Sequence, residues 1–217
     1  MNNINFEIYI NKVLKQVHPS LSISKDSKSQ LNYFLQLLTE DIVKEAVFLA
    51  SGNIYMMKKS RDVKKTLTAR EIQSALKSIF GYSQLMKHSV SEGVKAVSKF
   101  KSSEPGKRSK HKTPAKRSGL EFAPSKLKTL IKKYHNGNIG SVAPIYLAAI
   151  AEYITAEILE LAGNVARDNK RLTISSRHLL IAIENDDEIK ELVNKIDSKI
   201  LGGGVQPNIH AILLPKK

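Results

Sequence analysis

The sequence predicts an all-α protein that contains two similar three-helix units in one chain. Apolar residues recur at helical spacing in both halves, the order of short, long and short helix occurs twice, and a basic segment separates the two copies. A long helix flanked by two short ones cannot enclose its own apolar face, so each unit needs a partner of the same shape. The other half supplies that partner at a high effective concentration.

The first unit is predicted from helical stripes and end signals. A short helix stops at His18-Pro19, because proline cannot continue it; its apolar residues are Ile10, Val13, Leu14 and Val17. A long helix of about seven turns, ending near Gly52, is marked by Leu31, Phe34, Leu35, Leu38, Ile42 and Leu49. Thr68 and Glu71 form a capping-box signature for a third helix. A fourth helix, from Ser83 to about Lys99, carries Leu85, Val90, Val94 and Val97.

The second unit repeats this plan. A short helix carries Leu127, Leu130, Ile131 and Tyr134. A long helix begins at about Ala143 and Pro144, and its apolar stripe consists of Leu147, Ile150, Ile154, Ile158 and Leu161. Two short helices then follow, from Ser176 to Glu184 and from about Asp187 to Ile196.

The net charge of +15 indicates a polyanionic partner or an anionic membrane surface. Residues 1–100 carry 15 Lys and Arg against 8 Asp and Glu, residues 101–118 carry 7 against 1, and residues 119–217 carry 13 against 11. The segment 101–118 has Ala115 as its single hydrophobic residue, so we expect a flexible linker. Its alternatives are a solvated spacer and a spacer that also lies along phosphates, which its cations favour.

Several classes of function have no support in the sequence. There is no cysteine, so no disulfide framework is possible. The first residues lack a basic stretch followed by an apolar run, so we expect no secretory signal there. The apolar stretch 143–163 contains Glu152, Glu157 and Glu160, too many charges for a membrane span. No phosphate-binding glycine loop, metal-ligand spacing or nucleophile triad occurs, so we expect no enzyme, cofactor or metal.

Specific strings resemble two histones. In the first half these are YINKVLKQVHP (9–19), TAREIQSAL (68–76) and KHSVSEGVKAVSKF (87–100), which resemble histone 2B. In the second half, APIYLAAIAEYITAEILELAGNVARDNK (143–170), SRHLLIAIENDDE (176–188) and GGVQPNIHAILLPKK (203–217) resemble histone 2A. The fused order is similar to the histone doublets of large DNA viruses of the Marseillevirus group. The resemblance divides the chain into a histone 2B-like fold (1–100), a basic linker (101–118) and a histone 2A-like fold with a C-terminal docking segment (119–217).

The resemblance implies a core histone doublet that packages DNA. Two histone folds would pair in an intramolecular handshake and wrap double-stranded DNA without sequence specificity, together with a histone 4/histone 3 doublet and a second copy of this chain. It places the protein in the virion and the infected host cell, in a viral factory or the nucleus. The alternative is a histone-fold module, similar to a transcription-factor subunit pair, that binds DNA without wrapping it.

The resemblance also implies which residues contact DNA. The candidates are Lys25, Lys28, Lys58, Lys59, Arg61, Lys64, Lys65 and Thr66 in the first half, and Arg117, Lys126, Lys128, Lys132, Lys133, Lys170, Arg171 and Thr173 in the second. The loop HNGNIGS lacks the arginine that histone 2A has there, and Thr173 stands where the family usually has a minor-groove arginine. About nine extra residues lie around Gly52 to Lys65. We therefore expect a looser grip on DNA, since lysine lacks the planar fork of arginine.

Two protein-binding surfaces follow from the same resemblance. A protein-docking acidic patch would consist of Glu92, Glu152, Glu157, Glu160, Asp186, Asp187 and Glu188, with Gln84 in place of a family glutamate; a solvated helix face is the alternative. A C-terminal segment would dock on histone 3 and histone 4 through Val205, Pro207, Ile209, Ile212, Leu213 and Leu214; packing on the chain's own core is the alternative. His18 and His178 lie in the segments that resemble histones 2B and 2A, where they are expected to be structural rather than catalytic.

Overall fold

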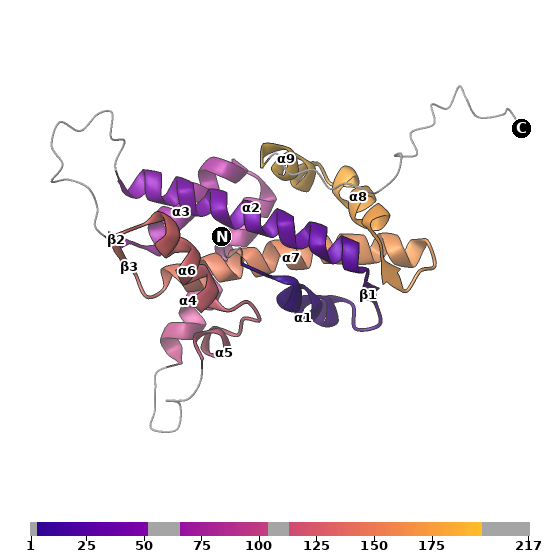
Figure 1. Ribbon diagram of the computed structural model, residues 1–217, viewed down its shortest axis with the longest axis horizontal. Helices are drawn as coiled ribbons and strands as arrows, with labels where there is room; N and C mark the ends of the chain where they lie inside the picture. Colours follow the sequence, from indigo (N-terminus) through magenta and orange to yellow (C-terminus); the bar gives the residue numbers. More distant parts are fainter. Residues whose placement is uncertain (1–3, 52–65, 104–112, 197–217) are drawn as a thin grey trace, which may run out of the picture.

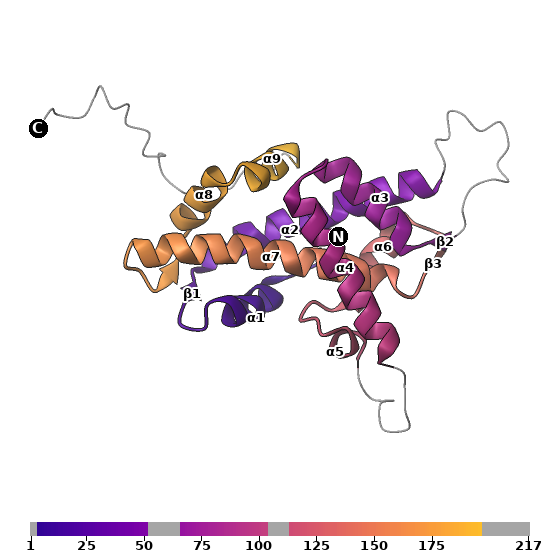
Figure 2. The same cartoon turned by 180° about the vertical axis from the view of Figure 1, so that it is seen from behind.

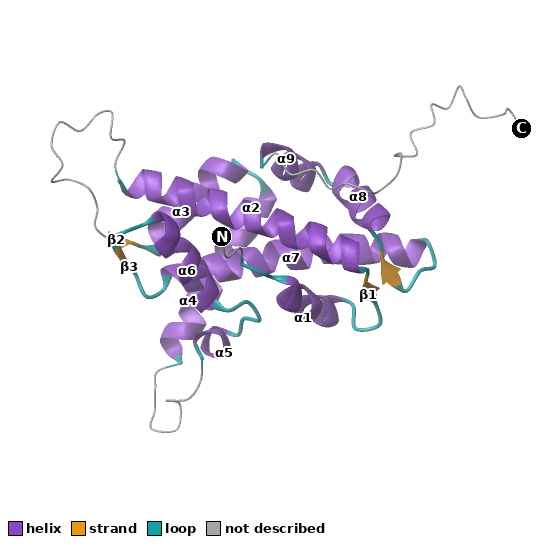
Figure 3. Cartoon of the chain, viewed as in Figure 1, coloured by secondary structure: helices purple, strands orange, loops and turns teal. Residues whose placement is uncertain are grey.

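The computed structural model describes residues 4–51, 66–103 and 113–196 (Figure 1). This part of the chain is mainly helical and includes four strands of two residues each (Figure 3).

The helices of the first half follow the predicted order. α1 (Glu7–Val17) is short, α2 (Lys25–Ala50) is long, and α3 (Ala69–Phe80) and α4 (Gln84–Ser102) come after them. Strand β1 (Ser22–Ile23) precedes α2, and β2 (Thr66–Leu67) precedes α3. Thr68 and Glu71 form the predicted capping box. The Thr68 side chain accepts a backbone N–H in the first turn of α3, and the Glu71 carboxylate accepts the backbone N–H of Thr68.

The helices of the second half repeat this order. α6 (Pro124–Tyr134), β3 (Asn138–Ile139), α7 (Ala143–Asp168), β4 (Thr173–Ile174), α8 (Ser176–Asn185) and α9 (Asp187–Lys195) follow one another. α7 ends in a Schellman motif, because the N–H of Arg171 donates to Ala166 O and that of Lys170 to Arg167 O. Lys170 has φ +54°, a left-handed conformation that a lysine adopts only at a cost.

The two long helices run antiparallel. β1, just before α2, pairs with β4, shortly after α7, and β2, between α2 and α3, pairs with β3, shortly before α7. Each end of α2 therefore lies near the opposite end of α7, and the view from behind shows both helices along the long axis of the molecule (Figure 2). Both strand pairs are parallel, and both join a loop of the first half to a loop of the second.

The two halves share one hydrophobic core. Both long helices contribute buried side chains, among them Phe34, Leu38, Ile42, Leu147, Ile150 and Ile154. Two glycines allow close approaches across this core. A Cβ atom at Gly93 of α4 would lie 2.6 Å from the ring of Tyr146, and one at Gly163 of α7 would lie 2.1 Å from the ring of His18. Glycine is needed at both positions because any side chain would overlap an aromatic ring.

Two residues of the predicted apolar stripes lie on the surface instead. Leu49, near the end of α2, is 40% exposed, and Val94 on α4 is 51% exposed. On α4, Gly93 and Ala96 are buried instead. The Tyr146 ring occupies the space that a side chain at position 93 would need.

The expectation of a flexible linker over residues 101–118 is wrong at both of its ends. α4 extends to Ser102, and Pro114–Ser118 form a short helix, α5. Thr113 caps α5 by accepting the Lys116 N–H, and Gly119 ends it with φ +71°. The linker was predicted from a lack of hydrophobic burial, but capping and polar contacts order these residues.

Arg117 holds the end of α4 against α5. Its guanidinium lies 4.1 Å from the centre of the Phe100 ring. Its Nε donates to Ser103 O at 3.2 Å and its Nη2 donates to Phe100 O at 3.2 Å. A stacked and hydrogen-bonded guanidinium of this kind stabilises the junction between the two halves.

Candidate nucleic-acid interface

The first paired-loop end of the molecule is formed by β1 and β4. Ser22 pairs with Thr173 and Ile23 with Ile174. The N–H of Ser22 donates to Leu172 O at 2.9 Å, and the N–H of Ser24 donates to Ile174 O at 2.9 Å. The hydroxyls of Ser22 and Thr173 lie 2.9 Å apart. Residues far apart in the sequence are thus fixed side by side at the surface.

Two helices start at this end, because β1 leads into α2 and β4 into α8. Ser24 caps α2 by accepting the N–H of Ser27. Ser175 caps α8 in a capping box with His178, whose Nδ1 accepts the N–H of Ser175 at 3.2 Å. Burial lowers the pKa of His178, and the nearby Arg171 and Arg177 lower it further, against a backbone hydrogen bond with Thr173. Helix N-termini carry partial positive charge and bind anions such as phosphate.

The structure brings several predicted DNA contacts together at the same end. Lys25 begins α2, Lys170 and Arg171 lie in the loop that follows α7, and Thr173 begins β4; all four are exposed. Lys28 is half-buried and lies 3.8 Å from the Glu7 carboxylate. Cations and hydroxyls therefore surround two helix N-termini here.

The second paired-loop end is formed by β2 and β3. Thr66 pairs with Asn138 and Leu67 with Ile139, and the N–H of Gly140 donates to Leu67 O at 2.8 Å. α3 and α7 begin here, so this end also presents two helix N-termini. Thr66 is a predicted contact and is half-buried. The neighbouring candidates Lys58, Lys59, Arg61, Lys64 and Lys65 lie outside the described residues.

The four lysines predicted on α6 fall into two groups. Lys128 and Lys132 are exposed. Lys126 donates to Asn5 O at 3.3 Å and lies over the Tyr9 ring. Lys133 lies over the Tyr134 ring and 3.9 Å from the carboxylate of Glu40, to which the Tyr134 hydroxyl also donates. Lys126 and Lys133 thus have partners within the chain, as Arg117 does.

A separate, acidic surface lies between α4, α7 and α9. A cavity of about 500 Å³ is lined by Glu157, Asp186 and Glu188, together with His88 and Tyr153, whose rings stack with centroids 6.3 Å apart. Burial raises the pKa of Glu157, and the charges of Glu160 and Asp186 raise it further, while a hydrogen bond from Tyr153 acts in the opposite direction. These carboxylates are close enough to form one negatively charged site.

The remaining members of the predicted patch differ in their surroundings. Glu160 and Asp187 are exposed, and Glu92 is half-buried with Lys95 at 2.7 Å. Glu188 has a structural role as well, since its carboxylate accepts the N–H groups of Gln84 and Leu85 at the start of α4.

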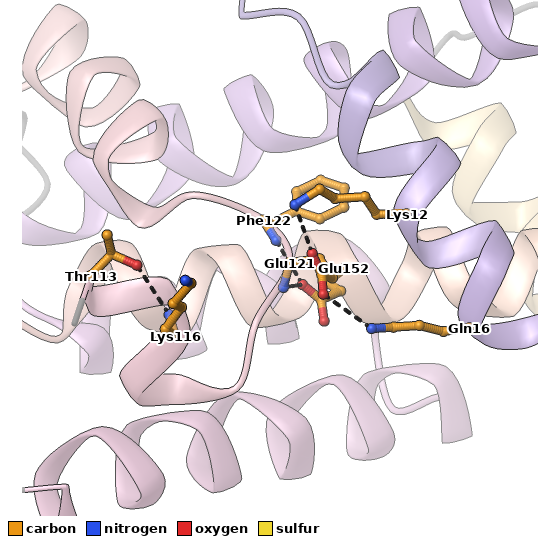
Figure 4. A network of polar contacts seen from close by, with 7 residues as sticks. All are labelled: Lys12, Gln16, Thr113, Lys116, Glu121, Phe122 and Glu152. Atoms are coloured by element: carbon orange, nitrogen blue, oxygen red, sulfur yellow. Dashed lines mark hydrogen bonds and ion pairs between the residues drawn. The ribbon is translucent and has the colours of Figure 1, made fainter.

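Glu152 is held inside the fold rather than presented as a free surface charge. Its Oε2 accepts the N–H groups of Glu121 at 2.7 Å and Phe122 at 2.9 Å (Figure 4). Burial raises its pKa, against those two hydrogen bonds. Glu121 itself bonds to Lys12 and Gln16 of α1, so this network ties α1 to α7 through the segment before α6.

Sequence reasoning missed several residues at these sites. Ser22 is a bridge residue of β1, Ser24 caps α2, and His88 and Tyr153 line the acidic cavity. A serine before a helix was a usable signal for Ser24. The others are defined by neighbours from distant parts of the chain.

The predicted docking residues Val205, Pro207, Ile209, Ile212, Leu213 and Leu214 lie outside the described residues. Within residues 4–51, 66–103 and 113–196, no helix is both long and apolar enough to cross a membrane. The same residues contain no group of three or more His, Asp or Glu side chains that could hold a metal ion.

Residues 102–185 match the family model of the core histone domain shared by histones 2A, 2B, 3 and 4. The match includes all of α5, α6, α7 and α8, together with the loops that carry β3 and β4. The chain is therefore a mostly helical protein with a histone-fold domain. Such a domain suggests a DNA-packaging or histone-like role and the binding of DNA and histone partners, and its family is not enzymatic.

Proposed function

We propose that this chain is a DNA-packaging protein with two histone folds, in residues 1–100 and 119–217, that pair within the chain as a histone handshake. The observation that carries the proposal is the pair of parallel bridges, β1 with β4 and β2 with β3, at opposite ends of two antiparallel long helices. Each bridge sets a loop of one half beside a loop of the other, which is the arrangement expected of paired histone folds.

DNA would be held at the two paired-loop ends. Each end presents two helix N-termini, whose N–H groups can bind phosphate, and the β1–β4 end adds the exposed cations Lys25, Lys170 and Arg171. We expect the exposed residues Lys25, Lys128, Lys132, Lys170 and Arg171 to contribute most. Lys28, Lys126, Lys133 and Arg117 make contacts inside the chain and would contribute less. Binding to phosphates is tolerant of sequence and weakens steeply with salt.

In the proposed particle, this chain acts as a histone 2B–histone 2A doublet of the kind found in the Marseillevirus group. Its partners are a histone 4/histone 3 doublet, which its C-terminal segment would contact, and a second copy of itself. It would act in the virion and the infected cell. The acidic cavity lined by Glu157, Asp186 and Glu188 would capture proteins through arginine side chains.

Nuclease digestion of a particle reconstituted from this chain, a histone 4/histone 3 doublet and long DNA tests the proposal. Wrapping predicts a discrete protected length that survives prolonged digestion. The alternative module, which binds DNA without wrapping, predicts only short protection that scales with the amount of bound protein. Omitting the partner doublet is the control and should abolish the long protected fragment.

The acidic cavity has its own test. Charge reversal of Glu157 and Glu160 should abolish capture of an arginine-anchored peptide and leave the protected DNA length unchanged, because the cavity and the paired-loop ends are separate surfaces. Loss of wrapping by a variant that still folds would contradict this assignment. Charge reversal of Glu45, half-buried on α2 and not a lining residue of this cavity, provides a control.

A further inference from the structure

Leu172 is an exposed apolar side chain at the end where β1 meets β4. It exposes 73% of its surface in the loop between α7 and β4. A single exposed leucine is common and needs no explanation by itself. Leu172 is distinguished by the hydrogen-bonded backbone that holds it and by the charged side chains in the neighbouring segments.

The backbone on both sides of Leu172 is fixed by hydrogen bonds. Leu172 O accepts the N–H of Ser22 at 2.9 Å and its hydroxyl at 3.3 Å. The N–H of Arg171 donates to Ala166 O at 2.8 Å in the Schellman motif. Thr173 is paired with Ser22 in the bridge. The side chain is therefore displayed by ordered backbone, so a contact through it would lose little conformational entropy.

Exposed cations outnumber exposed carboxylates in the segments that meet near this leucine, where the carboxylates are Asp26 and Asp168. Lys170 and Arg171 precede it and are exposed, as are Lys25 at the start of α2 and Arg177 in the first turn of α8. This charge favours a polyanion over an apolar protein surface as the partner. The minor groove of DNA offers phosphates along both edges and apolar deoxyribose surfaces between them, and other DNA-binding proteins place leucine and isoleucine side chains there.

We propose that Leu172 enters the minor groove of DNA bound at the β1–β4 end and packs against the deoxyribose surface, while Lys170 and Arg171 contact the flanking phosphates. This inference rests on the proposed function, because it requires DNA to bind at this end. It assigns an apolar contact to an interface otherwise made of cations, hydroxyls and backbone N–H groups.

Salt dependence separates this contact from an electrostatic one. The full chain is titrated with a short duplex over a series of salt concentrations, for the wild type, Leu172→Ala and Arg171→Ala. Leu172→Ala should weaken binding by roughly threefold to tenfold at every salt concentration, with the slope of log affinity against log salt unchanged. Arg171→Ala should reduce that slope by about 1. Val94→Ala, which shortens an exposed side chain on α4, is the matched control and should bind like the wild type.

Base substitution then tests the groove. Guanine carries an amino group in the minor groove and inosine lacks it, while their major-groove edges present the same acceptors. Wild type should bind an inosine·cytosine duplex more tightly than the matching guanine·cytosine duplex, and Leu172→Ala should lose that preference. Leu172→Met, of similar volume, should retain it.

Three results would overturn the inference. These are wild-type affinity in Leu172→Ala, a loss of affinity with a reduced salt slope, and a loss that leaves the inosine preference intact. In each of them the wild type still binds duplex DNA, so the proposed function stands. A wild type that shows no salt-dependent binding to duplex DNA overturns both the proposed function and this inference.

Discussion

The approach of His18 to Gly163 provides a quantitative test of how the two halves pack. A Cβ at position 163 would lie 2.1 Å from His18 Cδ2 and 2.2 Å from its Nε2, and His18 is only 6% exposed, so the ring cannot move freely. His18 Nε2 also lies 3.1 Å from Glu160 O in a hydrogen bond that a displaced ring would lose. The contact joins the end of α1, in the first half, to α7 in the second.

The expected effect of Gly163→Ala combines three terms. Overpacking a tight site costs about 1–3 kcal/mol, and the lost hydrogen bond costs about 1 kcal/mol. Replacing glycine by alanine inside a helix returns about 1 kcal/mol. The net loss in the free energy of unfolding is therefore about 1–3 kcal/mol.

The assay is denaturant unfolding of the free chain in a double-mutant cycle with His18→Ala. With the imidazole removed, the added methyl group has space, so Gly163→Ala should be neutral or stabilising by up to about 1 kcal/mol through helix propensity. The reasoning is refuted if Gly163→Ala stabilises the wild-type background, or if it destabilises both backgrounds equally.

Four further predictions concern single residues. Glu152→Ala should lower the free energy of unfolding by about 2 kcal/mol, because two backbone N–H groups lose their acceptor. Glu160→Ala is the comparison and should change that free energy by less than about 0.5 kcal/mol, because the Glu160 side chain is exposed. Tyr146→Phe should be neutral or stabilising in thermal unfolding, since the buried hydroxyl has no hydrogen-bond partner among the described residues and burial raises its pKa to about 12. Lys170→Gly should raise the unfolding free energy by up to about 1 kcal/mol by relieving the positive φ, and an unchanged or lower value would contradict the Schellman assignment. Because the pKa of His178 is lowered in the folded state, neutral His178 stabilises the fold above about pH 6.5, and this contribution is lost as the pH falls below that value. His178→Gln should therefore flatten the pH dependence of the free energy of unfolding over that range.

The helices were predictable from the sequence because the residues that pack on one face of a helix are apolar and recur at helical spacing. Ile150, Ile154 and Ile158 recur on one face of α7, and all three are buried. The strands were not predictable, since a two-residue bridge has no alternation to detect. Their register joins Ser22 to Thr173, 151 residues away, and depends on how the two halves pack.

The candidate site was predictable only in part, for a related reason. The sequence identifies cations near helix ends but not the partners that packing gives them. Lys133 lies beside Glu40, and Arg117 stacks on Phe100, so their availability depends on distant neighbours. Helical spacing correctly puts Glu152 and Glu160 on one helix, but it contains no information about the segment before α6, whose N–H groups Glu152 accepts.

Disulfide trapping tests most directly whether the two halves pair within one chain. The sequence contains no cysteine, so Ser22→Cys with Thr173→Cys introduces the only possible pair. These positions are bridge partners, and their native hydroxyls lie 2.9 Å apart, within the reach of a disulfide. Ser22→Cys with Asn138→Cys, which joins opposite ends of the molecule, is the control and should stay reduced. Intramolecular pairing predicts that mild oxidation of the first variant gives an internally cross-linked chain that sediments as a monomer, whereas disulfide-linked dimers or persistent free thiols would contradict it.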